Sequence, residues 1–87
     1  MGTVYISVFR EELVLGMTIA KRLKEYRKKQ HLTVIEIANI LMIPVRTFGS
    51  YERGEVLPGT KFYIKMLDKF NVNLNWLIAG RGNMLLD

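Results

Sequence analysis

The chain has 87 residues, which is enough for one hydrophobic core and too few for two domains. With 49% hydrophobic and 24% charged residues and no long apolar run, its composition excludes both a disordered chain and a membrane span. The net charge of +5 and a pI near 9.8 favour a polyanionic partner.

The first element is expected to be an extended N-terminal arm. Residues 3–9 are β-branched and aromatic with loose alternation, a pattern that favours an extended segment or a short strand. The charged residues Arg10, Glu11 and Glu12 interrupt this segment too early for a secretory signal. Together with Gly16 they separate an arm, residues 1–16, from the body of the domain, and Met17 is an alternative first residue of the protein.

A first helix is predicted for about residues 18–30, because apolar residues recur there at helical spacing, at Ile19, Leu23 and Tyr26. This helix holds most of the excess positive charge. Residues 1–32 carry seven Lys and Arg against three Asp and Glu, residues 33–54 two against two, and residues 55–87 four against three. A basic run of this kind is more often a solvated helix face than a binding site, so charge supports a nucleic-acid partner without establishing one.

The next two helices are short and lie close together. Thr33 followed three residues later by Glu36 is a capping box, which predicts a helix over residues 34–41 with Ile37, Ala38 and Leu41 on one face. Pro44 ends any preceding helix and begins another, which runs to about Arg53 with Gly54 just beyond its end. Two helices joined by so short a turn predict a helix-turn-helix.

Two more helices complete the predicted domain. Thr60 is expected to cap a fourth helix that ends near Phe70 and buries Tyr63, Met66, Leu67 and Phe70. Asn73 is expected to cap a fifth helix with apolar residues at Leu74, Trp76, Leu77 and Ile78. A break at residues 79–83 and an apolar tail follow. We therefore predict an all-α domain of five helices over residues 17–84, with residues 85–87 as a short tail.

The third predicted helix has the composition of a DNA-reading element. On a helical wheel Phe48, Tyr51 and Glu52 fall on the inner side, and the outer side holds Arg46, Gly49, Ser50 and Arg53. Arginine bonds guanine O6 and N7 through two hydrogen bonds, serine serves bases or phosphates, and glycine allows close backbone approach. The alternative for Gly49 is a small residue that the helix merely tolerates.

The residue inventory argues against an enzyme. Cysteine is absent, which removes disulfides and thiolate chemistry and fits a reducing cytoplasm, and His31 is the single histidine, expected to end the first helix. The sequence contains no pair of acids, no nucleophile with a base and no phosphate loop, since Gly80-Arg81-Gly82 is too short. We therefore expect no catalytic residue, no metal, no other cofactor, no small-molecule substrate and no membrane association.

Several sequence blocks resemble the Cro/CI-type phage repressor domains, which are lambda repressor-like. They are Ile-Ala-Lys-Arg-Leu-Lys-Glu-Tyr-Arg at 19–27, Leu-Thr at 32–33, Ile-Ala at 37–38, Arg-Thr-Phe at 46–48, Tyr-Glu-Arg-Gly at 51–54, Pro58, and Val-Asn-Leu-Asn-Trp-Leu-Ile-Ala-Gly-Arg-Gly at 72–82. The resemblance covers about residues 17–84. It implies a compact five-helix fold in which the third helix enters the major groove of double-stranded DNA.

The resemblance also implies roles for individual residues. Base contacts would come from Val45, Arg46, Gly49, Ser50 and Arg53. Phosphate contacts would come from Thr33, Thr47, Thr60, Lys61 and Arg27. Arg27 would also form a structural ion pair with Glu52 that locks the first helix to the third; the alternative is a weak surface pair.

Five positions depart from the family pattern. Val34 replaces a glutamine that bonds phosphate, and Pro44 replaces a serine cap. Met42 replaces a turn glycine and would carry any strain from a positive φ. Val34, Ile35 and Ile40 are apolar where polar residues are typical, which indicates either a wide core or a contact surface for the arm or a partner.

The expected function is that of a sequence-specific transcriptional regulator, a repressor that binds a palindromic operator as a homodimer. Candidate dimer-interface residues are Tyr5, Phe9, Trp76, Met84 and Leu85, with intermolecular strand pairing between the two termini as one possible mode. The expected location is the cytoplasm of a bacterium, at the nucleoid, with a bacterial or phage gene as the source. Alternatives are a helix-turn-helix used for protein–protein contact, the antitoxin of a toxin–antitoxin pair, and the N-terminal domain of a longer repressor.

Overall fold

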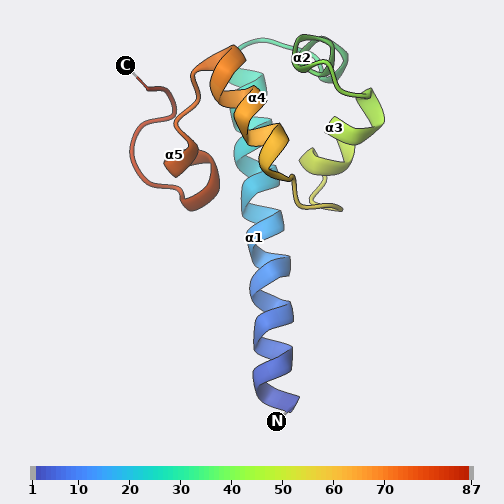
Figure 1. The fold of residues 1–87 in the computed structure, drawn as a ribbon, viewed down its shortest axis with the longest axis vertical. Helices are drawn as coiled ribbons and strands as arrows, with labels where there is room; N and C mark the ends of the chain where they lie inside the picture. Colours follow the sequence, from blue (N-terminus) through green and yellow to red (C-terminus); the bar gives the residue numbers. More distant parts are fainter. Residues whose placement is uncertain (1, 87) are drawn as a thin grey trace.

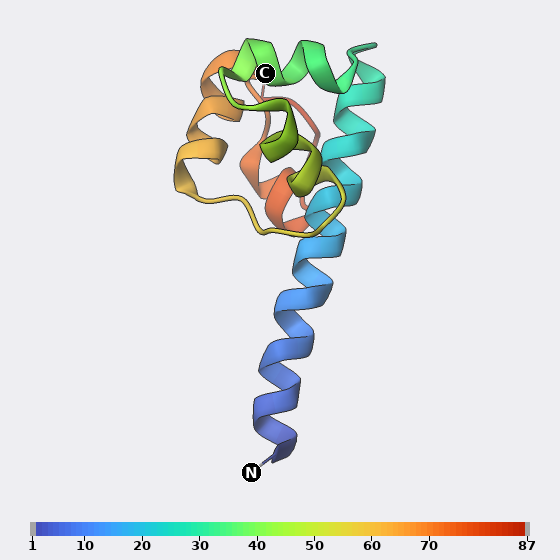
Figure 2. The same cartoon turned by 90° about the vertical axis from the view of Figure 1, so that its right-hand side faces the viewer.

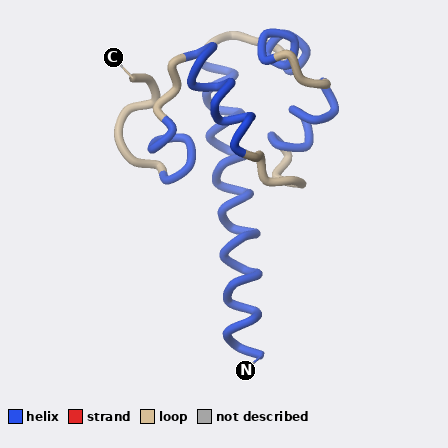
Figure 3. The backbone as a smooth tube through the Cα atoms, in the orientation of Figure 1, coloured by secondary structure: helices blue, strands red, loops and turns tan. Residues whose placement is uncertain are grey.

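The computed structural model describes the backbone of residues 2–86 and the side chains of residues 14–86. Over that range the chain forms five helices and no strand beyond one isolated β-bridge, as Figure 3 shows. The helices are α1 (Gly2–Lys29), α2 (Val34–Leu41), α3 (Val45–Glu52), α4 (Thr60–Phe70) and α5 (Leu74–Ala79). The all-α, five-helix prediction is confirmed. In Figure 1 the four shorter helices gather around the C-terminal half of α1.

The start of α1 differs from the prediction. The extended segment or strand expected at residues 3–9 is wrong, because α1 is continuous from Gly2 to Lys29. The β preference of those residues is a context-dependent bias, and extending an existing helix is easier than starting one. Figures 1 and 2 show the N-terminal half of α1 projecting from the globule, so the arm is helical.

Gly16 marks a close crossing between elements where the sequence suggested a break. It is buried within α1, and a Cβ at this position would lie 3.7 Å from Leu57 Cδ2 and 3.8 Å from the Gly54 carbonyl oxygen. These are ordinary van der Waals distances, so a Cβ would fit between α1 and the loop that follows α3, and the contact does not require glycine.

Every helix contributes to one core, which is the reason that these short helices are stable. The predicted inner faces of α1 and α2 are confirmed by their burial. The buried core residues are Ile19, Leu23, Tyr26, Ile37, Ala38, Leu41, Phe48, Phe62, Met66, Val72 and Leu77. Pairing of aromatic rings extends the core from α1 to α4, since Tyr26 and Phe70 meet edge-on with centroids 5.5 Å apart.

α4 buries most of the predicted face, with one residue exchanged. Leu67 was expected inside and is 38% exposed, whereas Phe62 is buried at 4%. The Phe62 ring packs edge-on against Tyr51 with centroids 4.8 Å apart, which joins α4 to α3. Of the other residues predicted inside, Met66 is buried, and Tyr63 and Phe70 are half-buried. The cap is Gly59, without a side-chain hydrogen bond, and Thr60 is the first residue of the helix.

Arg22, which belongs to the basic run, has a structural role at the end of α5. Its Nη1 donates to the carbonyl oxygens of Leu77 and Ile78, both at 3.2 Å. These carbonyls end a helix, where a cation is favoured. Gly80 ends α5 at φ 73, and a Cβ there would lie 2.6 Å from Arg22 Nη2. The arginine and the glycine therefore belong to one cap.

The apolar tail pairs within its own chain. Val72 and Leu85 form the antiparallel bridge. Asn73 N donates to the Met84 carbonyl at 2.8 Å, and Leu86 N donates to the Asn71 carbonyl at 3.0 Å. The suggested strand pairing between the two termini of different chains is therefore wrong, because the tail is paired in cis and the other edge is helical. The predicted Asn73 cap is confirmed, since its side chain accepts from Asn75 N.

Met42 carries the left-handed backbone that its position predicted. It ends α2 at φ 57 and ψ 46, and its side chain is 78% exposed. We expect Met42→Gly to raise the free energy of unfolding by about 0.5–1 kcal/mol, since glycine removes the left-handed strain and loses part of that gain to its larger unfolded-state entropy. Urea unfolding would measure the change. Met42→Ala, which keeps the Cβ, is the control, and an equal gain in both variants would contradict this explanation.

Candidate functional site

α2, a turn of three residues and α3 form the predicted helix-turn-helix. The capping box at the start of α2 is present: the Thr33 hydroxyl accepts from Glu36 N at 3.1 Å, and Glu36 Oε1 accepts from Thr33 N at 2.8 Å. The hydrogen bonds with Thr33 lower the pKa of the Glu36 carboxyl. Pro44 takes the cap position of α3 at φ −60, which is compatible with the first turn.

The inner side of α3 is held by a buried aromatic residue. Phe48 has no exposed surface, and its ring lies 6.2 Å from that of Phe62 between centroids. Tyr51, half-buried, also packs against the Phe62 ring. In Figure 2 α3 crosses the near face of the globule, and no other helix lies in front of it. The inner side therefore anchors α3 while its outer side stays accessible.

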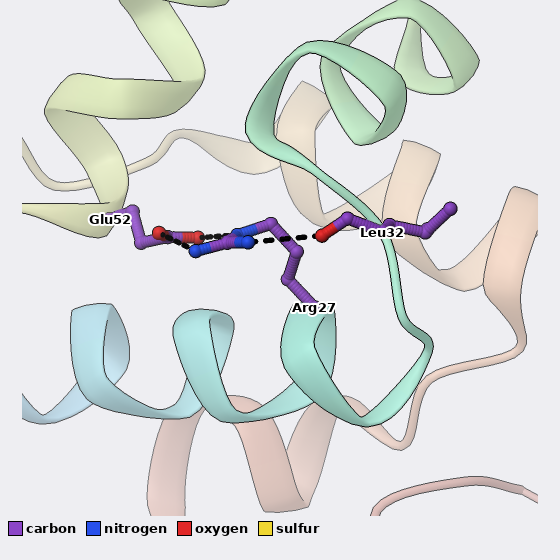
Figure 4. Close-up of polar contacts among 3 residues, drawn as sticks. All are labelled: Arg27, Leu32 and Glu52. Carbon is purple, nitrogen blue, oxygen red and sulfur yellow. Dashed lines mark hydrogen bonds and ion pairs between the residues drawn. The ribbon is translucent and has the colours of Figure 1, made fainter.

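Arg27 and Glu52 form a two-point ion pair that joins α1 to α3 (Figure 4). Arg27 Nε and Nη2 donate to the two carboxylate oxygens of Glu52, each at 2.8 Å. Arg27 Nη1 donates to the Leu32 carbonyl at 3.0 Å, which adds the segment before α2. The Glu52 hydrogen bonds raise the pKa of the guanidinium, and only 13% and 8% of the two side chains are exposed. The geometry is that of the partly buried structural pair.

The predicted base-contact residues on the outer side of α3 differ in how exposed they are and in whether they form ion pairs. Arg46 is exposed without an ion pair among the described side chains, and Val45 is 40% exposed. Ser50 is half-buried. Gly49, expected to offer open backbone, is buried.

The Arg53 guanidinium covers Gly49. A Cβ on Gly49 would lie 2.8 Å from Arg53 Nη1. Arg53 in turn is bonded by Glu55, since its Nε and Nη2 donate to the two carboxylate oxygens at 3.0 Å each. This contact lowers the pKa of the Glu55 carboxyl and raises that of Arg53. The sequence reasoning did not single out Glu55; its position two residues after Arg53 was the available signal.

Four of the five predicted phosphate-contact residues lie at helix starts around α3, and the fifth, Arg27, lies in the last turn of α1. Thr33, Thr60 and Lys61 are exposed and Thr47 is half-buried. Thr33 keeps its hydroxyl proton free to donate, since its oxygen is the acceptor in the capping box. Arg27 has three of its donors bonded within the chain and little exposed surface, so it has the least room for a phosphate.

The apolar departures in α2 fall into two groups. Val34 packs against the core, which accounts for its character. Ile35 is 60% exposed and Ile40 is 41% exposed, so neither belongs to a wide core. These two residues leave apolar surface on α2.

The candidate dimer-interface residues differ in how much of each side chain is exposed for contact with a second copy. Tyr5 and Phe9 lie outside the residues whose side chains the structure describes. Trp76 and Met84 are half-buried and pack against their own core, and Leu85 is 39% exposed. Exposed apolar residues at the end of the arm and just beyond it are Val14, Leu15 and Met17.

Other kinds of site find no support among the described residues. His31 is exposed and left-handed at φ 57, directly after α1, as a helix-ending residue would be. Across the part of the chain with described side chains, no three His, Cys, Asp or Glu residues cluster as metal ligands would. Nor does any described helix have the length and apolarity needed to cross a membrane.

Similarity to known proteins agrees with this geometry. The family model described as helix-turn-helix matches residues 23–77, which contain α2, α3 and the Arg27–Glu52 pair. A similar protein is the HTH-type transcriptional regulator ImmR of Bacillus subtilis (strain 168), 35% identical over 63 residues. The alignment covers 72% of this chain, which spans about half of that relative's length (50%). No solved structure matches the chain.

Proposed function

This chain belongs to the helix-turn-helix family, and we propose that it binds duplex DNA through the outer side of α3 and regulates transcription. The observation that carries the proposal is an accessible helix with Arg46 exposed and Ser50 and Arg53 beside it, fixed from within by Phe48 and Glu52. A helix of this kind fits a major groove about 12 Å wide, where arginine reads guanine. The similarity to a transcriptional regulator supports the same assignment.

The phosphates on either side of the groove would be bound by residues at helix starts. Thr33 begins α2, and Thr60 and Lys61 begin α4, where backbone N–H groups and the helix dipole favour an anion. Thr47 would add a hydroxyl from the first turn of α3. We expect these contacts to set affinity and orientation and to leave sequence preference to α3.

We further propose a homodimer on a palindromic operator, with two α3 helices in major grooves about 34 Å apart. Support for a dimer comes from α1, whose N-terminal half projects from the globule in Figures 1 and 2 and which exposes Val14, Leu15 and Met17 near its middle. An isolated helix gains little stability without burying an apolar face, and a second copy would supply that burial. Occupation of such an operator within a promoter would repress transcription.

Arg46 and Lys61 provide a matched pair of substitutions. We expect Arg46→Ala to weaken binding to the preferred sequence by about 1–3 kcal/mol and to relax the preference at one base pair, because it removes a base contact. Lys61→Ala should weaken binding to all sequences alike and reduce the salt dependence, because it removes a phosphate contact. Fluorescence anisotropy with matched and single-substituted duplexes would measure both. Uniform weakening by Arg46→Ala would contradict its assignment to base reading.

A second candidate function rests on Ile35 and Ile40, whose exposure on α2 suits a protein partner, including the toxin of a toxin–antitoxin pair. A salt titration of binding to random duplex separates the two functions. A DNA regulator should lose affinity steeply between about 50 and 200 mM salt as several counterions are released. Absence of duplex binding even at low salt would contradict the DNA-binding proposal and favour protein contact.

A further inference from the structure

The turn that ends α3 fixes the position of Glu55 beside the proposed DNA-reading surface. Arg53 is the C-cap residue of α3, and Gly54 follows in the left-handed region at φ 75. Gly54 N donates to the Tyr51 carbonyl at 3.2 Å, and Glu55 N donates to the Ser50 carbonyl at 3.0 Å. This pair of bonds is a Schellman motif. The backbone therefore holds Glu55 against the C-terminal end of α3 before any side-chain contact is considered.

The Glu55 side chain bonds Arg53, whose guanidinium contacts two further residues on the outer side of α3. Its carboxylate accepts two hydrogen bonds from Arg53, each at 3.0 Å. The same guanidinium covers Gly49 and reaches Ser50 Oγ at 3.5 Å. The two-oxygen edge of the carboxylate resembles the O6/N7 edge that guanine offers to arginine. Another hydrogen-bond acceptor can reach Arg53 and replace Glu55, because 57% of the Arg53 side chain and 56% of the Glu55 side chain are exposed.

We propose that Glu55 is a specificity-determining residue, which keeps Arg53 paired on non-cognate DNA and releases it only where a base edge replaces the carboxylate. This inference rests on the proposed function of α3. The affinity for non-cognate DNA depends on the number of Lys and Arg side chains that neutralise phosphates. While Arg53 is paired with Glu55, it does not contribute to that number. A cognate base restores the two hydrogen bonds that Arg53 gives up. Glu55 therefore weakens non-cognate binding more than cognate binding.

The test is Glu55→Gln, which removes the charge and keeps the shape of the side chain. Binding to a random duplex and to the selected operator would be measured from about 50 to 200 mM salt. We expect affinity for the random duplex to rise roughly three- to tenfold and its logarithmic salt slope to steepen by about 0.9, the value of one added phosphate contact. Operator affinity should change less, so the ratio of operator to random affinity should fall.

Glu25→Gln is the matched control, because Glu25 is an exposed acid of α1 and its loss changes the net charge equally. If both variants change the salt slope and the affinity ratio alike, net charge accounts for the effect and the proposal for Glu55 is overturned while DNA binding stands. If the unmodified chain binds no duplex, both the proposed function and this inference fail. Equal melting temperatures of the variants would confirm that the comparison concerns folded protein.

Discussion

Replacing Phe48 by alanine is expected to lower the free energy of unfolding by about 3–5 kcal/mol. Phe48 has no exposed surface and faces Phe62 across the interface between α3 and α4. Its removal leaves a cavity and withdraws the apolar anchor of a helix only 8 residues long. The whole free energy of unfolding of a small domain is about 5–15 kcal/mol. A loss of this size should therefore release α3 from its fixed position, and DNA binding should fall with it.

Urea unfolding followed by circular dichroism would measure this loss. Ile35→Ala is the control, because it also removes a large apolar side chain, but one that is 60% exposed. It should change the free energy of unfolding by less than about 0.5 kcal/mol. If the two substitutions cost the same, the placement of Phe48 at the centre of the core is contradicted.

Breaking the Arg27–Glu52 pair is expected to have the next largest effect. Arg27→Ala and Glu52→Ala should each lower the free energy of unfolding by about 2–3 kcal/mol, between the values for exposed and fully buried pairs. In the intact pair only 13% of the Arg27 side chain and 8% of the Glu52 side chain are exposed, so each substitution leaves a charge with limited access to water and no partner. Because the pair joins α1 to α3, thermal melting should fall by roughly 10 °C or more.

A double-mutant cycle separates the pair from the other contacts of Arg27, including its bond to the Leu32 carbonyl. We expect the double variant to be more stable than the sum of the single losses implies, with a coupling above about 1 kcal/mol. Additive losses would mean that the two charges act independently. The structural lock between α1 and α3 would then be contradicted.

Local signals explain why α2, α3 and their caps could be predicted from the sequence. Thr33 and Glu36 satisfy each other's backbone within one turn, and Gly54 supplies the positive φ that ends α3. The left-handed backbone at Met42 could be predicted because Met42 stands where the family that the chain resembles has a turn glycine. Such features depend on neighbours a few residues apart.

Contacts between distant residues could not be predicted in the same way. Arg22 looked like part of a basic surface because its acceptors, the carbonyls that end α5, lie 55 and 56 residues away. Phe62 precedes Met66 by four residues, so helical spacing allows either Phe62 or Leu67 on the inner side of α4, and the contact of Phe62 with the distant residue Tyr51 is not visible in the local sequence. The N-terminal segment was predicted as extended from a β preference that helix continuation overrides.

Among the proposed site residues, Arg46 and Arg53 looked equivalent in the sequence and differ in the structure. Arg46 is exposed, whereas Arg53 is bonded by Glu55 and covers Gly49. The difference depends on the direction that the Arg53 side chain takes beyond the end of α3, toward Glu55. Helical spacing does not predict that direction. The proposed reading surface therefore has one free arginine and one that must exchange partners.

Selection of bound sequences from a random duplex library by the full chain tests the central claim most directly. We expect enrichment of a palindrome whose half-sites are about one helical turn apart, with guanine at a position where Arg46→Ala abolishes the preference. Enrichment of no sequence, or of a sequence that Arg46→Ala leaves unchanged, would contradict the claim that the outer side of α3 reads DNA.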